Sequence, residues 1–549
     1  MSIPHKDQVR IKIWQIVTII LLLFVAFIQC FKTTHDLHWP FDFDFDRDMA
    51  FVQGTLEGDF GKDPNYLHQY LWYNPLLFLT ETAIVKLTGL PVNIVLAQAG
   101  AYLNLLSPVA FIIMLGYFFN LHIAIAGLIS YLFLASGELP AWASATYSPW
   151  LYPGSFMQFI FYINIIFCFK AFKTQRYRWF FLSGLTAGIA FLGHTAPAVL
   201  IILIMFSMQA GNIMTAIKQK KFKKLQKYFL QGIFAFIPFV LASLPLLYFI
   251  IGKYNLHIIN RMTFEYFDEL FIPINFPKLL MANLSFTLLI SIIGFLFFLK
   301  NCTDVLLKKI LYNWFFISVT LFFYTSMVPV VHHKYHLHLP GLVPSFHFFF
   351  YLKALQSVFF GYGFYTIARQ IIFYGSAMIN KQRGTFAPLV SSEKIFLMVS
   401  LLLVIVNLPD YTGRKDFVDS RLSCIAKEND SNKIQVYEWI VKNIPQDGVI
   451  LCEDKESVFP VMATGRKMVS INSTFSNPYL DFGKREADRN TMLAFLKSGQ
   501  PDSIKRLFDE YNVSAVLLKN TGNFNHNIIS QLFSRITFQN SQYTIFKKI

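Results

Sequence analysis

Long apolar segments separated by short polar loops occupy about the first 408 residues of the chain. A helix needs about 20 apolar residues to span a bilayer, and fewer when it packs within a bundle. On this basis the sequence predicts eleven spans, at residues 13–31, 92–118, 121–137, 152–172, 179–193, 195–208, 228–251, 286–299, 311–330, 346–372 and 395–408. The predicted fold class is therefore a polytopic α-helical membrane protein.

The loops between these segments carry the clusters of basic residues. Lysines and arginines concentrate in residues 170–178, 218–227, 300–309 and 381–383. Basic residues favour the cytoplasmic side of a membrane, so we expect these loops inside the cell. A cytoplasmic N-terminus and eleven crossings then place the C-terminus outside. This placement accounts for the net charge of +16 without a nucleic-acid partner.

The segment 179–209 lies between two of these basic loops and is 31 residues long. A single crossing would place the two loops on opposite sides of the membrane, against the charge rule. Gly193 and Pro197 favour a turn, because glycine is conformationally free and proline cannot continue the helical hydrogen bonding. We therefore expect a hairpin of two short helices that turns at residues 193–197.

Composition supports a membrane protein and excludes a soluble one. The chain has 549 residues, of which 54% are hydrophobic and 15% charged, whereas soluble domains carry about 25% charged residues. No small-residue cleavage site follows Cys30, so we expect the first span to remain uncleaved. The five cysteines have no CxxC spacing, which argues against a metal or disulfide framework. Pairing of Cys424 with Cys452 stays open.

The pattern changes near Pro409. Residues 434–444 have helical amphipathic spacing, residues 448–453 fit a buried strand, and the helix–strand order then repeats. Residues 536–548 predict a terminal hairpin. The sequence thus indicates a transmembrane domain at 1–408 and an extracytoplasmic α/β domain at 409–549.

The first outer loop, residues 32–91, opens with a dense acidic cluster. A helix starting near Asp46 would place Asp46 and Asp48 in its first turn, where the helix dipole favours carboxylates. We predict these two as catalytic residues, acting as a general base on an acceptor hydroxyl or binding a divalent cation such as Mg or Mn. Asp42 and Asp44 fit a solvated approach, and a solvated helix cap is the structural alternative.

Two further groups of candidate residues are expected on the outer side. Glu138 lies at a helix end, and Tyr147 and Trp150 follow it. Their rings fit either an interfacial aromatic belt or stacking on a sugar. His194 lies at the hairpin apex and fits either a structural polar group or a substrate contact. We predict substrate binding for all four residues.

A segment rich in histidine and lysine comes before and within a late span. Its candidate substrate-binding residues are His332, His333, Lys334, His336 and Lys353. Cationic and donor groups at a membrane surface suit a lipid-linked phosphate. A zinc site and simple interfacial polarity are the alternatives, although catalytic zinc ligands usually lie on rigid elements. We assign no metal ligand here.

These features together resemble the membrane glycosyltransferases of the GT-C class, to which bacterial lipid A aminoarabinose transferase and the protein O-mannosyltransferases belong. The resemblance rests on the acidic first loop and "GTLEGDFGKDPNYLHQYLWYNPLLFLTETAIVKLTGLP" (54–91), the hairpin "GLTAGIAFLGHTAPAVL" (184–200), "HKYHLHLPGLVP" (333–344) and "YEWIVKNIPQDGVIL" (437–451). It covers most of the chain in architecture. His194 is a departure, since many relatives carry lysine at that turn.

The resemblance implies a hexosyl- or pentosyltransferase of the bacterial cytoplasmic (inner) membrane. Such an enzyme moves a sugar from a polyprenyl-phosphate-linked donor to a lipid, glycan or protein acceptor outside. The first-loop acid, Asp46 or Asp48, would be the base, and Lys334 and Lys353 would hold the donor phosphate. A transporter or flippase is the alternative, yet such proteins carry charges within spans and often paired repeats. A non-catalytic envelope assembly protein is the second alternative.

Overall fold

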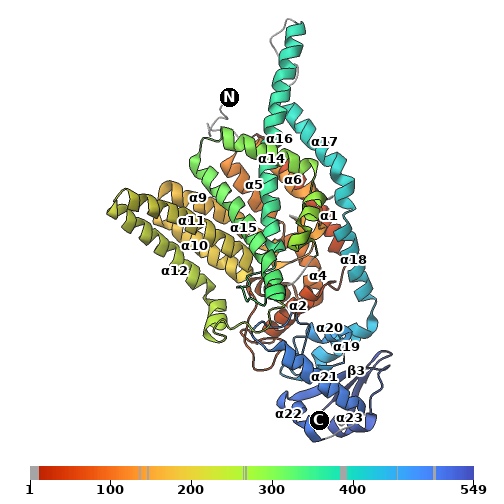
Figure 1. Cartoon of the computed structure of the whole chain (residues 1–549). Helices are drawn as coiled ribbons and strands as arrows, with labels where there is room; N and C mark the ends of the chain where they lie inside the picture. Colours follow the sequence, from red (N-terminus) through yellow and green to blue (C-terminus); the bar gives the residue numbers. More distant parts are fainter. Residues whose placement is uncertain are drawn as a thin grey trace. The chain divides into compact units, whose positions relative to one another are not determined.

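The structure is a computed structural model (Figure 1) that describes residues 12–134, 138–144, 147–263, 265, 269–383, 392–453, 455–498, 502–533 and 535–548. The chain divides into two compact units. The first unit comprises Met1–His35, Gly100–Ser243 and Phe267–Asp419. The second unit comprises Asp36–Ala99, Leu244–Tyr266 and Ser420–Ile549.

The first unit is helical. Its α-helices are α1 (Ile13–Thr34), α5 (Leu106–Phe118), α6 (Leu121–Phe133), α7 (Ala141–Ser144), α8 (Pro153–Phe156), α9 (Gln158–Thr174), α10 (Tyr177–Gly193), α11 (Thr195–Lys218), α13 (Phe276–Ala282), α14 (Phe286–Asn301), α15 (Val305–Tyr335), α16 (Phe346–Arg383) and α17 (Ser392–Thr412). Two 3-10 turns, η1 (Glu269–Phe271) and η2 (Pro273–Asn275), precede α13. Helices α4 (Val92–Leu103), α12 (Phe222–Gly252) and α18 (Lys415–Glu428) continue from one unit into the other.

The apolar segments of the sequence are helices in the structure. Seven helices of the described chain are long and apolar enough to cross a membrane, and an eighth results if the bent pair of α13 and α14 forms one span. All eleven predicted spans coincide with helices, although residues 135–137 of one prediction lie outside the described residues. The helices at three predictions, 121–137, 179–193 and 346–372, are not among these seven or eight in the described chain. The predicted hairpin is confirmed, with α10 and α11 separated by His194 alone. The chain is a multi-pass membrane protein.

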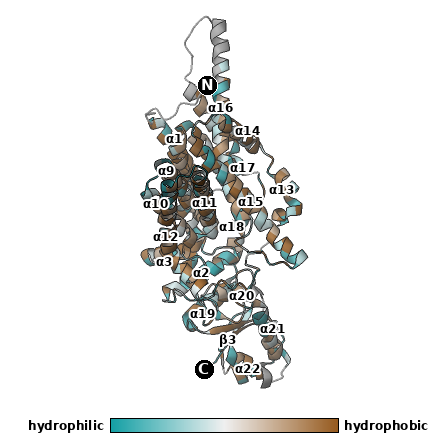
Figure 2. Ribbon diagram, turned by 60° about the vertical axis from the view of Figure 1, so that its left-hand side comes forward, coloured by the Kyte–Doolittle hydropathy of each residue, from teal (hydrophilic) through white to brown (hydrophobic). Residues whose placement is uncertain are grey.

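Close helix packing in the first unit depends on small residues. A Cβ on Gly363 of α16 would lie 2.4 Å from the carbonyl oxygen of Ile290 in α14, and one on Gly294 would clash with the backbone of α16 in the same way. Small residues let helix backbones approach closely inside a membrane. Many large apolar residues of α11 and α12 are exposed, among them Phe206, Phe236 and Leu241. The ribbons of these helices are largely coloured as hydrophobic (Figure 2), as a lipid solvent requires.

The second unit combines helices with a mixed sheet. Its helices are α2 (Phe43–Leu56), α3 (Leu76–Thr88), α19 (Ser431–Asn443), α20 (Lys455–Met462), α21 (Phe482–Ser498), α22 (Asp502–Glu510) and α23 (His526–Leu532). Its strands are β1 (Val449–Cys452), β2 (Lys467–Met468), β3 (Val513–Lys519), β4 (Arg535–Gln539) and β5 (Tyr543–Lys547), in the order β2-β1-β3-β5-β4. Strand β1 pairs in parallel with β2 and β3, and β5 pairs antiparallel with β3 and β4. The terminal hairpin predicted from the sequence is β4–β5.

The first polar loop is part of the core of this unit. Tyr66 is 1% exposed and packs in an apolar cluster with side chains from α19 and from β1, β3 and β5. Its hydroxyl lies 2.8 Å from the hydroxyl of Ser476. The backbone N–H of Met468 donates to the carbonyl of Asn65 at 2.8 Å. The second unit therefore contains residues 36–99 and 244–266 in addition to residues 420–549, whereas residues 409–419 of the segment grouped from the sequence belong to the first unit.

Candidate functional site

The acidic cluster of the first loop forms the start of α2. Asp42 lies at the N-cap position with an extended backbone, and its carbonyl accepts from the N–H groups of Phe45 and Asp46. Asp44 and Asp46 lie in the first turn, where the unpaired N–H groups of the helix favour negative charge. The helix thus begins three residues earlier than the sequence predicted, so Asp48 lies beyond the first turn in which it was expected. It carries both predicted catalytic aspartates into buried positions.

Asp46 forms a buried ion pair with a lysine from α18. Its Oδ1 accepts from Nζ of Lys427 at 2.7 Å, and the aspartate is 1% exposed. Burial raises the pKa of Asp46 to about 7, while the Lys427 charge opposes the increase. The lysine ammonium also lies 3.8 Å from the centre of the Phe459 ring. Asp46 therefore exchanges a proton near neutral pH, which suits a general base.

Asp48 forms a second buried ion pair, with the adjacent Arg47. Nε of Arg47 donates to Oδ1 of Asp48 at 2.9 Å, and its NH1 group lies 2.8 Å from Oδ1 of Asp44. The same guanidinium donates to the Tyr73 hydroxyl at 2.7 Å. Burial raises the pKa of Asp48 to about 6, while Arg47 opposes the increase. Arg47 was not among the residues predicted from the sequence, although an arginine between Asp46 and Asp48 in an acidic segment was a visible signal.

Glu81 is a further acidic group that was not predicted from the sequence. It lies in α3, is fully buried, and neither of its carboxylate oxygens hydrogen-bonds to a residue in the described part of the chain. Burial raises the pKa of Glu81 well above its ordinary value, and the charge of Asp48 raises it further. Burial and the neighbouring carboxylate therefore both favour the protonated form of Glu81. The available signal was a glutamate in the middle of an apolar helix.

A pocket of about 310 Å³ opens beside Asp46. Its lining residues are Phe41, Phe43, Asp46, Ala426, Lys427, Asp430, Lys433 and Phe459. Asp48 does not line it. The pocket therefore distinguishes the two aspartates that the sequence left equivalent.

In the first unit, Glu138 and Lys353 come together in a buried ion pair. Nζ of Lys353 donates to Oε2 of Glu138, and also to Oδ1 of Asn283 at 2.7 Å. Gln356 and Ser285 donate to Oε1 of Glu138 at 3.0 and 2.8 Å. The structure thus joins two candidates from distant segments. The lysine charge is already compensated by the glutamate.

Three other candidates of the first unit, Tyr147, Trp150 and His194, have contacts within the helical unit itself. Tyr147 and Trp150 are both buried, and the Tyr147 hydroxyl donates to the carbonyl of Ala101 at 2.6 Å. His194 caps α11, because its Nδ1 accepts from the N–H of Ala196 at 3.1 Å. The ring of His194 also lies 4.3 Å from that of His347. Packing and capping account for these contacts.

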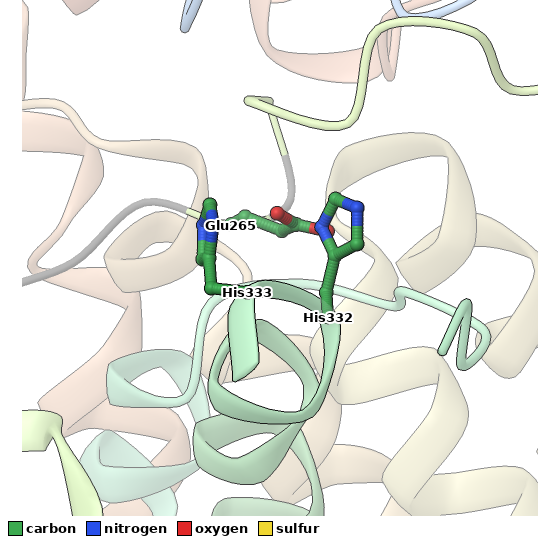
Figure 3. A group of neighbouring side chains, drawn as sticks. All are labelled: Glu265, His332 and His333. Carbon is green, nitrogen blue, oxygen red and sulfur yellow. The ribbon is translucent and has the colours of Figure 1, made fainter. Parts of the chain in front are cut away.

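The histidine-rich segment forms a polar end to α15. The rings of His332 and His333 lie 5.2 Å apart and project from the last turn of this helix (Figure 3). His333 and Lys334 are exposed, and His336 ends the helix in a left-handed conformation with φ of 54°. The His332 ring lies 4.8 Å from that of His338. An exposed group of imidazoles and an ammonium can receive an anion.

The first-loop carboxylates are already paired with protein cations. Lys427 binds Asp46, and Arg47 binds both Asp44 and Asp48. A divalent cation coordinated here would have to displace one of these side chains. The acidic cluster as it stands fits a metal poorly, so no catalytic step is assigned to one.

Comparisons with solved structures identify the fold. The Archaeoglobus fulgidus oligosaccharyltransferase, tethered to an acceptor peptide, has a TM-score of 0.52 and 10% identity, over 95% of this chain and 70% of that one. ArnT from Cupriavidus metallidurans, bound to undecaprenyl phosphate, has a TM-score of 0.52 and 11% identity, over 98% of each chain. ArnT in the apo state gives a TM-score of 0.51. No family model matches the chain, and no curated protein matches it significantly.

Both structural neighbours are GT-C membrane glycosyltransferases, and the match extends over nearly the whole chain. At this level of identity the likeness establishes the fold. The chain has the GT-C fold of a polytopic membrane protein, with a small sheet near its C-terminus. The fold class predicted from the sequence is confirmed.

Proposed function

We propose that the chain is a membrane glycosyltransferase that moves a hexosyl or pentosyl group from a polyprenyl-phosphate-linked donor to an acceptor on the extracytoplasmic side. The observation that carries this proposal is Asp46, a buried carboxylate with a pKa of about 7 beside an open pocket. The fold supports it, because one neighbour is an oligosaccharyltransferase and another was solved with undecaprenyl phosphate.

In the proposed reaction, Asp46 accepts the proton of the acceptor hydroxyl. The hydroxyl oxygen forms a bond to the anomeric carbon of the donor sugar, and the bond from that carbon to the phosphate oxygen breaks. The polyprenyl phosphate leaves with the bonding electron pair. A positioned base of this kind contributes about 10²–10⁴-fold to a rate. Lys427 holds Asp46 in place and stabilises its ionised form.

The leaving phosphate needs cationic stabilisation as negative charge develops on it. We assign this role to the exposed end of α15, where His332, His333, Lys334 and His336 gather. We propose that Lys353 also contacts the donor phosphate. For this contact the phosphate has to compete with Glu138 for the ammonium group of Lys353. Glu138, His194, Tyr147 and Trp150 would then shape the donor site from within the helical unit.

Asp48 is proposed as a positioning residue. Arg47 ties it to Asp44 and Tyr73 and so fixes the first turn of α2. Loss of the Asp48 carboxylate should therefore reduce activity less than loss of the Asp46 carboxylate.

We place this activity in the bacterial cytoplasmic membrane, with the N-terminus inside and the second unit outside, from the distribution of basic loops. A divalent cation stays a candidate cofactor, because consecutive histidines such as His332 and His333 offer nitrogen ligands. Chelation with EDTA tests it. Full activity after chelation would mean that the protein side chains suffice.

The central experiment compares Asp46→Asn and Asp48→Asn in purified full-length protein supplied with polyprenyl-phosphate-linked sugars. We expect Asp46→Asn to lower kcat about 10²–10⁴-fold and Asp48→Asn to have a smaller effect. Asp509→Asn is the matched control, since Asp509 is an exposed member of a surface pair. The proposal fails if wild-type protein consumes no donor or if Asp46→Asn retains the wild-type rate.

A further inference from the structure

We propose that the pocket beside Asp46 is the acceptor subsite and that it takes an uncharged sugar ring. In this arrangement Phe43 and Phe459 contact the apolar face of the ring, and one sugar hydroxyl reaches Asp46. The inference rests on the proposed function, which it extends by naming the chemical class of the acceptor.

The size of the pocket fits a single sugar ring. Its volume is about 310 Å³, at the lower end of the range of roughly 300–1,000 Å³ that small-molecule sites occupy. Such sites are mainly apolar and contain a few well-placed polar groups. Here Phe41, Phe43 and Phe459 supply the apolar walls, and two acid–base pairs supply the polar groups.

The charges that line the pocket cancel when Asp46 is ionised, the form in which it acts as a base. Lys427 pairs with Asp46 at 2.7 Å, and Lys433 pairs with Asp430 at 3.0 Å. A phosphate or a uronate in the pocket would gain from the two lysines but would also meet two carboxylates. A site for an anion would instead carry an excess of positive charge. The balance favours a neutral ligand with several hydroxyl groups.

The aromatic walls favour a ligand with a flat apolar face. Phe43 is 40% exposed although it is a large apolar residue, and covering its ring would remove apolar surface from water. It also stacks on Phe475, with ring centres 6.0 Å apart, so the ring is held in a defined position. The ammonium group of Lys427 lies over the face of the Phe459 ring and holds that ring in place. The C–H face of a pyranose is a suitable partner for such rings.

The hydrogen bonding of Asp46 leaves room for the acceptor. Within the described residues only Oδ1 of its carboxylate accepts a hydrogen bond, from Lys427. Oδ2 is therefore available to an acceptor hydroxyl. A sugar in the pocket would present that hydroxyl next to the proposed base.

The first test measures acceptor kinetics of purified full-length protein with a fixed polyprenyl-phosphate-linked donor. The acceptors are methyl hexopyranosides, the methyl glycosides of the corresponding uronic acids (the uronates, with a free carboxylate), and a neutral glycolipid in nanodiscs. We expect transfer to at least one neutral acceptor, and a KM about tenfold higher for the matched uronate. Comparison of the soluble glycosides with the glycolipid in nanodiscs shows whether the acceptor sugar is soluble or attached to a lipid. Equal KM values for neutral and anionic acceptors would overturn the inference.

Phe43→Ala tests the aromatic wall. We expect the acceptor KM to rise about tenfold while the donor KM stays unchanged. Phe60→Ala is the matched control, because Phe60 is 46% exposed in the same unit but does not line this pocket. An unchanged acceptor KM in Phe43→Ala would contradict the subsite.

Asp430→Asn tests the charge balance and keeps the α19 helix cap, since asparagine caps a helix as well as aspartate does. The variant leaves Lys433 unopposed, so we expect the KM for the uronate to fall about fivefold relative to that for the neutral acceptor. If this ratio does not change, the charge argument is wrong.

Binding separates the inference from the proposed function. Saturation-transfer NMR with the methyl hexopyranosides requires no donor and no turnover. Binding by wild type that Phe43→Ala abolishes would support the sugar site even if no donor were consumed. Absence of neutral-sugar binding in a protein that still transfers sugar would overturn the subsite and leave the proposed function intact.

Discussion

Asp46 and Asp48 lie two residues apart on α2, yet their surroundings differ. Asp46 is paired with a lysine from a distant part of the sequence and lines a pocket. Asp48 is paired with its neighbour Arg47 and lies close enough to Glu81 to raise the pKa of that residue. Because the two acids differ in their cationic partner and in access to the pocket, they can take different roles. Asp46 suits proton exchange with an acceptor, and Asp48 suits positioning.

Replacement of Lys427 by methionine should shift the pH dependence of activity. The lysine charge opposes the effect of burial on Asp46, so its removal raises the pKa of Asp46 above about 7. A general base works in its ionised form, so the rising limb of the pH–kcat profile should move to higher pH. The measurement is kcat between pH 5.5 and 9.5.

Lys497→Met is the control for that shift, because Lys497 also lies over a phenylalanine ring but far from Asp46 in sequence, at the end of α21. A purely structural role for Lys427 would lower activity equally at every pH. That outcome would contradict the assignment.

Glu81→Gln should make stability less dependent on pH. The folded pKa of Glu81 lies well above the unfolded value near 4.5. Wild-type protein therefore loses stability as the pH rises above about 4.5 towards the folded pKa, because the unfolded chain releases the proton more readily. Glutamine does not titrate, so the Tm difference in favour of the variant should be greater at pH 8 than at pH 5. Equal differences at both pH values would mean that Glu81 is ionised in the fold.

At the scale of elements, helix pairs in the first unit depend on a few small residues. Gly294 in α14 and Gly363 in α16 face one another so closely that a Cβ on Gly363 would lie 2.8 Å from the Cα of Gly294. The benefit is dispersion contact along both backbones, which replaces the hydrophobic effect where lipid is the solvent. In the sequence, the segments of α14 and α16 show apolar character, and nothing in them indicates that these two glycines meet.

Gly363→Leu should destabilise the full chain by about 1–3 kcal/mol, the usual cost of overpacking a tightly packed interface. Thermal unfolding in detergent measures the effect. Gly232→Leu in α12 is the matched control, since nothing lies within 4 Å of a Cβ at Gly232. Equal Tm values for the two variants would show that α14 and α16 do not pack closely.

At the scale of the whole molecule, the second unit is assembled from three separate parts of the chain. Asn65 and Tyr66 connect the first loop to α20, β2 and the following loop, through hydrogen bonds and apolar packing. Asp63 accepts from the Asn477 side chain at 2.9 Å within the same core. Since Asp46 is reached by a lysine from this unit, folding of the α/β unit and assembly of the proposed base are coupled.

Tyr66→Ala should destabilise the second unit by about 3–5 kcal/mol, as large-to-small changes of buried aromatic residues do. Limited proteolysis of the full chain should then cleave both the first loop and the C-terminal segment sooner. Tyr70→Ala is the control, because Tyr70 lies in the same loop but is 39% exposed. Faster cleavage of the C-terminal segment alone would indicate two independently folded parts.

The sequence by itself determined the membrane class, the helical segments and the hairpin at His194, and it proposed Asp46 and Asp48 as candidate catalytic residues at a helix start. Each depends on local pattern: hydropathy, the distribution of basic loops, turn residues and carboxylates at a helix start. Only the tertiary structure brought Lys427 to Asp46, paired Glu138 with Lys353, buried Glu81 and included the first loop in the α/β unit. Those features join residues up to several hundred positions apart, and the burial that shifts a pKa exists only after the segments have packed together.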